Sequence, residues 1–441
     1  MHRLNATVAA EGRQWPLAAR AAALVGLLIL AACTRTTSSE LQPGSYRATV
    51  EIAAGKWVPF GLDVAQEERG TVLYVINGAE RIRLDELKVG TGTLEARFPG
   101  YETVLQARVA GTELTGDVLL PRSGGKVARL PFKATLGDTW RFFPDALPQN
   151  ADVAGRWSAE FTGDGERREP GVATFEQSFE RVTGTVQLPA GDQRFLAGEV
   201  RDEELRLSRF DGGAAVLYEA RLDEQGRLVG TSWSDRGEAR RFVATRDPDA
   251  SIDAAALATR LRDPLEPFTF AFRDPDGKTI ASSDPLFKDK VVLVTLAGSW
   301  CPNSHDEAAL LVQLDRKYRA RGLQIVSLMF EQHAEFEQAV RAVQRFRQAH
   351  GIQYPTLIAG EADKAKAAAA LPQLDAVAAY PTAIFIDRAG RVRSIQTGFA
   401  GPATGVQHDL LAHDFELQIE ELLGSPAEPA ATPTDVAAVS P

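Results

Sequence analysis

The spacing of apolar residues changes partway along this chain of 441 residues, and the change constrains the fold more than any other feature. From about residue 44 to 245, short stretches such as YRATVEI, TVLYVI and RFVAT alternate apolar and polar residues between Gly, Asp and Asn. This period of two is typical of strands that bury one face. After about residue 265 the apolar runs are continuous, as in VVLVTLA and LQIVSLMF, which is typical of strands covered on both faces. The sequence therefore predicts an all-β half followed by an α/β domain.

The all-β half contains a weak internal repeat, which predicts two tandem modules at residues 44–140 and 151–246. GSYRATVEI, which begins at residue 44, recurs as GRWSAEFTG at residue 155, and a longer segment that begins at residue 94 recurs loosely at residue 205. Strands separated by frequent turns close most easily into small barrels or sandwiches, because closure hides their edges. One large sandwich is the alternative.

Three tryptophans of the all-β half allow two interpretations. Trp57, Trp157 and Trp233 could line a cup that holds a ligand, since the Gly-Trp and Gly-Tyr starts of the modules resemble those of lipocalin and avidin barrels. Packing in the core or between strands is the favoured interpretation, because aromatic side chains in strands commonly have that role.

The C-terminal half divides into three parts. Residues 247–264 form a charged linker, residues 265–424 form the α/β domain, and the Pro- and Ala-rich residues 425–441 form a tail that we expect to be disordered. Between the first two apolar runs, Leu310 and Leu314 lie on the apolar stripe of a predicted helix. This alternation of strand, helix and strand predicts a parallel sheet, and a strand pair that turns at DRAG adds an antiparallel edge.

Residues 1–33 are expected to be an export signal and not part of a folded domain. Basic residues precede AAALVGLLILAAC, whose apolar run is shorter than the about 20 residues of a membrane span. The end of this run, LAAC, resembles the bacterial lipobox, which implies that Cys33 is lipidated and anchors a periplasmic protein to a membrane. Thr34 after the cysteine favours the outer membrane. A plain cleaved signal with a chance cysteine is the alternative.

Charge and composition exclude several classes of function. The net charge is −10, so the chain has no basic field that would hold a nucleic acid. The six histidines are scattered and the two cysteines lie far apart, so we expect no metal site and no cofactor. If Cys33 carries lipid, no cysteine of the same chain remains to pair with Cys301.

Cys301 lies in GSWCPNSHDE, between a predicted strand and a predicted helix. At a helix start, the helix dipole and amide N–H groups without intrahelical partners favour a thiolate, so we expect the pKa of this thiol to be lowered. Pro302 suits the first helical turn, which needs no N–H at that position. The sequence therefore predicts a nucleophilic sulfur at neutral pH.

Three motifs, FTFAFRDPDGK, KVVLVTLAGSWCPNSHDE and AYPTAIFID, resemble those of the TlpA-like thiol-disulfide proteins of the bacterial envelope, within the thioredoxin superfamily. The resemblance covers about residues 265–424 and implies a thioredoxin-like fold. It also implies a cis peptide bond before Pro381, opposite the cysteine. The substrate-binding surface would then comprise Trp300, Pro302, Tyr380, Pro381 and Thr382.

The chain departs from this pattern at several positions. Ser304 replaces the second cysteine, so no internal thiolate can release a mixed disulfide, although its hydroxyl can donate a hydrogen bond to the Cys301 thiolate. Thr295 stands where thioredoxins keep a buried acid, so we expect that proton route to be absent. His305 is expected to be an exposed helix residue without a role. Glu331, at the end of a predicted strand, is a candidate proton carrier, with a solvent-exposed strand end as the alternative.

These residues support one favoured hypothesis and two others. The favoured hypothesis is monothiol exchange through Cys301 and Ser304, with envelope protein thiols and disulfides or small thiols as partners. A non-catalytic adaptor with a degenerate thioredoxin-like domain is the main alternative. A one-cysteine peroxidase is disfavoured, because Gly298 stands where the peroxiredoxin motif has threonine.

Overall fold

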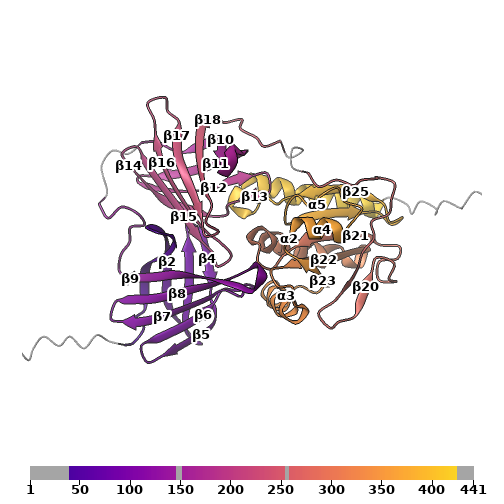
Figure 1. The fold of residues 1–441 in the computed structure, drawn as a ribbon, viewed down its shortest axis with the longest axis horizontal. Helices are drawn as coiled ribbons and strands as arrows, with labels where there is room; N and C mark the ends of the chain where they lie inside the picture. Colours follow the sequence, from indigo (N-terminus) through magenta and orange to yellow (C-terminus); the bar gives the residue numbers. More distant parts are fainter. Residues whose placement is uncertain (1–38, 146–150, 254–257, 425–441) are drawn as a thin grey trace, which may run out of the picture.

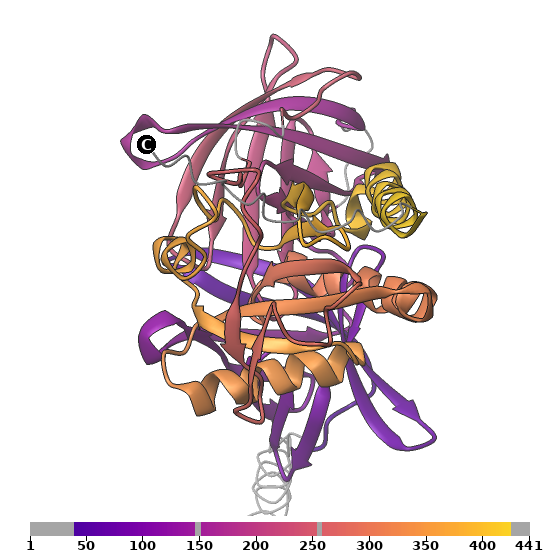
Figure 2. The ribbon, with the colours of Figure 1, turned by 90° about the vertical axis from the view of Figure 1, so that its right-hand side faces the viewer.

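The computed structural model describes residues 39–145, 151–253 and 258–424, and within them the strands form three sheets. In Figure 1 the first β unit (residues 44–136) and the second β unit (residues 155–246) lie at the left, and the α/β domain lies at the right. Figure 2 shows the α/β domain in front of the junction between the two β units. The prediction of a β half followed by an α/β domain is confirmed.

Two predictions fall on residues that the structure does not describe. The export signal with Cys33 and the disordered tail at residues 425–441 both lie outside the described ranges. Within those ranges, the structure contains no helix with the length and apolar character that a membrane crossing requires.

The first β unit is one antiparallel sheet in the order β4-β3-β2-β1-β9-β8-β7-β6-β5. Its alternating sequence turns one side of each strand toward a core, as in β7, where buried and exposed residues alternate. Tight turns such as that at Gly111, whose φ is +66°, join neighbouring strands. The strands are β1 (Gly44–Ala53), β2 (Lys56–Glu67), β3 (Gly70–Asn77), β4 (Glu80–Arg83), β5 (Asp85–Gly90), β6 (Thr93–Arg97), β7 (Val104–Ala110), β8 (Glu113–Arg122) and β9 (Lys126–Leu136).

The second β unit closes on itself. Its order is β11-β10-β18-β17-β16-β15-β14-β12-β13, and an additional pairing of β11 with β12 completes a ring. Trp157, Phe161, Tyr218 and Phe242 lie in its core, so aromatic side chains occupy the space that a ligand cup would need. The strands are β10 (Gly155–Thr162), β11 (Arg168–Ser178), β12 (Arg181–Leu188), β13 (Gly191–Asp192), β14 (Leu196–Arg201), β15 (Glu204–Phe210), β16 (Ala215–Leu222), β17 (Leu228–Ser234) and β18 (Ala239–Arg246).

The two β units share one apolar cluster. Phe210 and Leu217 of the second unit are buried in the core of the first unit, and Trp233 packs against it. The Phe210 ring centroid lies 5.0 Å from that of Phe60 and 5.1 Å from that of Phe98. The two units therefore pack as one body, which the repeat in the sequence did not reveal.

The α/β domain contains a seven-stranded sheet in the order β20-β19-β23-β22-β21-β24-β25 within the described residues. Alternate residues of β21 face opposite sides: Val291 and Leu293 pack with α2, α3 and α5, whereas Val292 and Val294 pack with α4. Helices therefore cover both faces of the sheet. The strands are β19 (Ala271–Arg273), β20 (Thr279–Ala281), β21 (Val291–Ala297), β22 (Leu323–Glu331), β23 (Thr356–Glu361), β24 (Thr382–Ile386) and β25 (Val392–Thr397). The helices are α2 (Pro302–Tyr318), α3 (Phe336–His350), α4 (Lys364–Ala370) and α5 (Val406–Gly424).

Part of the predicted linker, residues 247–264, packs on the α/β domain. Leu261 forms a β-bridge with Leu374, and the Thr259 N–H donates to Thr397 Oγ1 at 2.9 Å. The end of this segment is therefore held against the domain that follows it. Short 3-10 helices lie at η1 (Ser123–Gly125), η2 (Asp164–Glu166), η4 (Arg319–Arg321) and η5 (Pro402–Thr404).

Candidate active site

Cys301 lies in the turn that joins β21 to α2. Its N–H donates to the Gly298 carbonyl at 3.0 Å, its backbone is extended, and Pro302 is the first residue of the helix. The predicted position at a helix start is confirmed. Glycine suits residue 298, because a Cβ there would lie 2.8 Å from the Phe330 carbonyl oxygen and 2.4 Å from Trp300 Nε1. The turn therefore has no room for the threonine of a peroxiredoxin motif.

The turn faces the loop before β24, where the expected cis peptide bond joins Tyr380 to Pro381. Cys301 Sγ lies 3.4 Å from the Tyr380 carbonyl oxygen. The rings of Trp300 and Tyr380 meet edge-on with their centroids 5.8 Å apart. Thr382 is fully buried, and its hydroxyl donates to a backbone carbonyl within the loop. The structure therefore brings Trp300, Tyr380 and Pro381 close to the sulfur, whereas Thr382 lies inside the core.

Burial raises the pKa of the Cys301 thiol above its ordinary value. The side chain is only 6% exposed, and a thiolate would lose its hydration there. The Ser304 hydroxyl, the backbone N–H groups of Ser304 and Asn303, and the charge of Arg236 act in the opposite direction. The expectation of a lowered pKa is therefore wrong. The helix start has the expected effect on the thiol, but desolvation outweighs it.

The second β unit covers two sides of this turn. The Arg236 guanidinium, between β17 and β18, lies 5.2 Å from the Trp300 ring centroid. Asn303 Nδ2, in the first turn of α2, donates to Asp192 Oδ1 at 2.9 Å, and the Gly401 N–H donates to the same oxygen at 2.8 Å. These contacts join segments that are far apart in the sequence, so the motif around Cys301 could not reveal them.

Glu331, at the end of β22, is buried behind the turn. Its carboxylate accepts hydrogen bonds from the Ser299 N–H at 2.9 Å and the Ser299 hydroxyl at 2.6 Å. Burial raises its pKa to about 7, although both hydrogen bonds act to lower it. The alternative of a strand end in solvent is therefore wrong, since Glu331 is only 1% exposed. Its role as a proton carrier stays a prediction.

A second buried acid, Glu307, was missed in the sequence. Its carboxyl oxygen lies 2.5 Å from the hydroxyl of Thr295, which donates to it, and burial raises its pKa to about 8. α2 thus places an acid against Thr295, which stands where thioredoxins keep one. The expected absence of that proton route stays a prediction. Glu307 precedes Leu311 and Leu314 on the buried stripe of α2, and an acid at such a position is the signal that could have identified it.

His305 is buried and not exposed as expected. Its Nε2 lies 2.8 Å from the Ser299 carbonyl oxygen, and its Nδ1 lies 2.8 Å from His350 Nε2. The ring stacks on Tyr101 of the first β unit with the centroids 4.0 Å apart. Burial holds the pKa of His305 well below its ordinary value, so the ring is neutral at neutral pH. His305 therefore helps to position the turn that carries Cys301.

A buried charge cluster joins all three parts of the molecule. Arg194 of the second β unit lies 2.7 Å from Glu80 of the first unit and 3.2 Å from Asp306 of α2. It also lies 3.5 Å from Asp211. Burial raises the pKa of Asp306 to about 7 against the opposing effect of Arg194. The cluster therefore links Asp306 of α2 to both β units.

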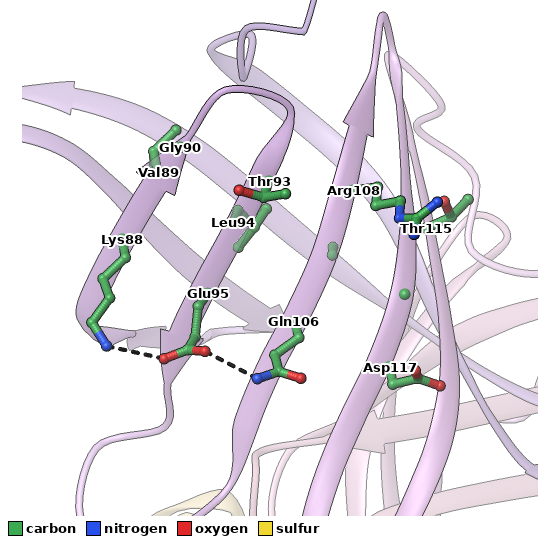
Figure 3. Close-up of a pocket in the computed structure, with 12 residues that line it drawn as sticks. Lys88, Val89, Gly90, Thr93, Leu94, Glu95, Gln106, Arg108, Thr115 and Asp117 are labelled. Carbon is green, nitrogen blue, oxygen red and sulfur yellow. Dashed lines mark hydrogen bonds and ion pairs between the residues drawn. The ribbon is translucent and has the colours of Figure 1, made fainter.

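Two observations bear on ligand binding away from Cys301. Among the described residues, no group of three His, Cys, Asp or Glu side chains could hold a metal ion. A groove of about 790 Å³, lined by charged, polar and apolar residues, lies on β5, β6, β7 and β8. Figure 3 shows Glu95 there between Lys88 and Gln106, with N···O distances of 3.1 and 3.0 Å. All residues that line the groove belong to the first β unit, so it is separate from the Cys301 site.

The solved structures that match this chain include the following two. A thiol:disulfide interchange protein, thioredoxin family protein, from Chlorobium tepidum TLS is 22% identical, and the match covers 37% of this chain and 98% of that chain with a TM-score of 0.29. A DsbF homologue from Corynebacterium diphtheriae is 19% identical, and the match covers 40% of this chain and 98% of that chain with a TM-score of 0.29.

A family model and two curated relatives also match this chain. The model of the AhpC/TSA family matches residues 262–395. Thiol-disulfide oxidoreductase ResA from Bacillus thuringiensis subsp. konkukian and from Bacillus cereus are each 27% identical over 123 residues. Each match covers 28% of this chain and 62% of the relative, so the chain spans less than two thirds of the relatives' length. Residues 262–395 are thus similar to the AhpC/TSA family, and the two curated relatives are named thiol-disulfide oxidoreductases.

Proposed function

We propose that this chain is an envelope-anchored, TlpA-like thiol oxidoreductase in which Cys301 acts alone by mixed-disulfide exchange. The observation that supports this most is the position of Cys301 at the start of α2, with its Sγ at Tyr380 and Ser304 in place of a second cysteine. The Ser304 hydroxyl acts to lower the pKa of the thiol, so it favours the thiolate that exchange requires.

In the proposed reaction the Cys301 thiolate attacks a disulfide R–S–S–R′. A bond forms between Sγ and the sulfur of R, the S–S bond breaks, and R′S⁻ leaves. Ser304 cannot displace the bound sulfur, so an external thiolate attacks that sulfur and releases Cys301 as a thiolate. Each step exchanges one disulfide for another, so no further oxidant or reductant is consumed.

Glu331 is the proposed proton carrier. Burial keeps Cys301 a thiol at neutral pH, so the thiol must lose a proton before it attacks. Glu331 bonds to Ser299, two residues before Cys301, and its pKa of about 7 lets it accept or release a proton near neutral pH. In this proposal Glu331 takes the thiol proton and returns it when the leaving thiolate departs.

We also propose that lipidated Cys33 holds the protein on the periplasmic side of the outer membrane. Its partners there are protein thiols and disulfides or small thiols. The basic residues, the apolar run and LAAC at residues 30–33 support this location. Labelling cells with a fatty-acid analogue should mark the native chain but not Cys33→Ser, and equal labelling of the two would contradict the anchor.

Capture of mixed disulfides in intact cells tests the proposed reaction. Cells that make the native chain are quenched with acid, alkylated and separated on non-reducing gels. Disulfide-linked adducts should appear and should be lost in Cys301→Ser. Ser304→Cys adds a resolving thiol, so it should reduce the adducts and create insulin-reducing activity. A native chain that carries neither a protein adduct on the gel nor a small-thiol adduct by intact mass would contradict single-cysteine exchange.

The burial of Cys301 favours a second candidate, a non-catalytic adaptor. A turn closed by Asp192 and Arg236 of the second β unit suits a fixed binding surface better than an open active site. The adaptor would bind the same partners in Cys301→Ser as in the native chain and would form no disulfide adducts. The capture experiment therefore separates the two candidates.

A further inference from the structure

Two cations from different parts of the molecule flank Cys301. Arg236 of the second β unit lies over the Trp300 ring, and its charge acts on the Cys301 thiol. Lys364, the first residue of α4, donates from Nζ to the Ala378 carbonyl, two residues before Tyr380, and it also interacts electrostatically with Cys301. Within the described residues, neither cation forms a direct ion pair with a carboxylate, although the charges of Glu169 and Arg167 both act on Lys364.

The carboxylates of these same segments are already engaged. Asp363, next to Lys364, caps α4 and accepts hydrogen bonds from two backbone N–H groups of the helix. Asp235, next to Arg236, pairs with Arg122 of the first β unit. Asp235 is therefore compensated by Arg122, and the cations whose charges interact with the Cys301 thiol are Arg236 and Lys364.

The space around Cys301 favours a small reaction partner. Cys301 is 6% exposed, and its Sγ is in contact with the Tyr380 carbonyl oxygen. The second β unit also contacts Trp300 and Asn303 on either side of the sulfur. A folded protein cannot reach the sulfur without separating these parts, whereas a small molecule needs only local opening.

We propose that the partner of Cys301 is a low-molecular-weight thiol or disulfide that carries carboxylates, with Arg236 and Lys364 as the residues that select its charge. This inference rests on the proposed monothiol exchange and identifies its substrate class. The Cys301 thiolate attacks the anionic disulfide R–S–S–R, forms Cys301–S–S–R and releases RS⁻. A second thiolate R′S⁻ then attacks the sulfur of R and releases R–S–S–R′ and the free Cys301 thiolate.

A charge series of small disulfides tests the proposal on the full chain in a Cys33→Ser background. The probes are dithiodipropionate as the dianion, bis(2-hydroxyethyl) disulfide as the neutral compound and cystamine as the dication. The rate of mixed-disulfide formation, measured by intact mass, is divided by the rate with a free cysteine peptide, which corrects for intrinsic reactivity. We expect the dianion to react fastest and the dication slowest, with about a tenfold span at about 0.01 M salt that shrinks at about 1 M salt.

Charge-neutral variants assign the effect to the two cations. Arg236→Gln with Lys364→Gln should remove most of the tenfold span. The matched control is the double variant Arg227→Gln with Lys366→Gln. It also loses one arginine and one lysine charge, at an exposed turn and at another position on α4, and it should keep the tenfold span of rates. Equal rates for the three probes, or a faster dication, would overturn the charge selection and leave monothiol exchange intact. Failure of every probe to form an adduct would overturn the proposed function itself.

Discussion

The start of α2 and the second β unit meet at Cys301, but they affect the thiol in different ways. The start of α2 supplies the hydroxyl and N–H groups of Ser304, which favour the thiolate. The second β unit closes over the same turn through Asp192 and Arg236 and adds to the burial that favours the thiol, although the charge of Arg236 favours the thiolate. The motif around this cysteine thus describes its local chemistry, whereas distant segments decide how exposed and how acidic the thiol is.

Removing Arg194, the cation that joins α2 to the second β unit, should have the largest effect on the stability of the fold. Arg194→Ala leaves Glu80 and Asp306 buried without their shared partner, and breaking such a buried pair costs about 3–5 kcal/mol. Urea unfolding measures this loss. The control Arg227→Ala breaks an exposed pair with Asp223 and should cost less than about 1 kcal/mol. Equal losses in the two variants would show that the cluster does not hold the parts together.

Loosening the contact between the second β unit and the turn that carries Cys301 should raise the reactivity of Cys301. Asp192→Ala removes the oxygen that accepts hydrogen bonds from Asn303 and Gly401, a loss of about 1–2 kcal/mol. The rate of iodoacetamide modification at neutral pH should then increase about tenfold. Asp223→Ala, in an exposed turn, is the control and should leave the rate unchanged. If Asp192→Ala were modified by iodoacetamide at the same rate as the native chain, the second β unit would not limit access to the sulfur.

Removing the Ser304 hydroxyl at the start of α2 should have a smaller effect on the reactivity of Cys301, and of opposite sign. Ser304→Ala removes a hydrogen bond that stabilises the Cys301 thiolate, which is worth about 1 kcal/mol. The modification rate at neutral pH should fall about fivefold, and its pH profile should move to higher pH. Ser45→Ala, at an exposed hydrogen bond with Asp63, should change neither quantity. An unmoved pH profile in Ser304→Ala would remove the proposed role of this hydroxyl.

The buried acids of α2 should make stability depend on pH in a direction opposite to that of ion-paired surface acids. Burial raises the pKa of Glu307 to about 8, so the folded chain holds a proton that the unfolded chain releases above about pH 4. This contribution is complete below about pH 4 and is lost as the pH rises through about 8.

Glu307→Gln cannot release this proton. Its urea midpoint should therefore rise relative to that of the native chain between about pH 5 and about pH 8. Glu420→Gln, at the surface of α5, is the control and should follow the native curve. Parallel curves for Glu307→Gln and the native chain would show that Glu307 is not held protonated.

Residue patterns predicted the local features and missed the contacts between distant segments. The change of apolar spacing separated the β half from the α/β domain, and the Trp-Cys-Pro motif placed Cys301 at a helix start, since both depend on neighbours in the sequence. Asp192, at the end of β13, and Arg194, between β13 and β14, lie about a hundred residues before Cys301 and carry no motif, so their contacts with α2 needed the structure.

The errors in the predicted site have the same origin. Cys301 was expected to be acidic, and His305 to be exposed, because the second β unit and Tyr101 could not be placed against α2 from the sequence. The shared core around Phe210 was missed for a related reason, since the internal repeat indicated separate modules. Tertiary packing therefore decides the properties of this site that its motif leaves open.

The most direct test is a single turnover of the folded chain in a Cys33→Ser background, followed by intact mass. The chain is mixed with a small disulfide, the excess is removed, and an external thiol is added afterwards. Single-cysteine exchange predicts one mixed disulfide at Cys301 that persists until the thiol is added and then disappears with full recovery of the free chain. A folded chain that forms no adduct, while the urea-unfolded chain does, would contradict it.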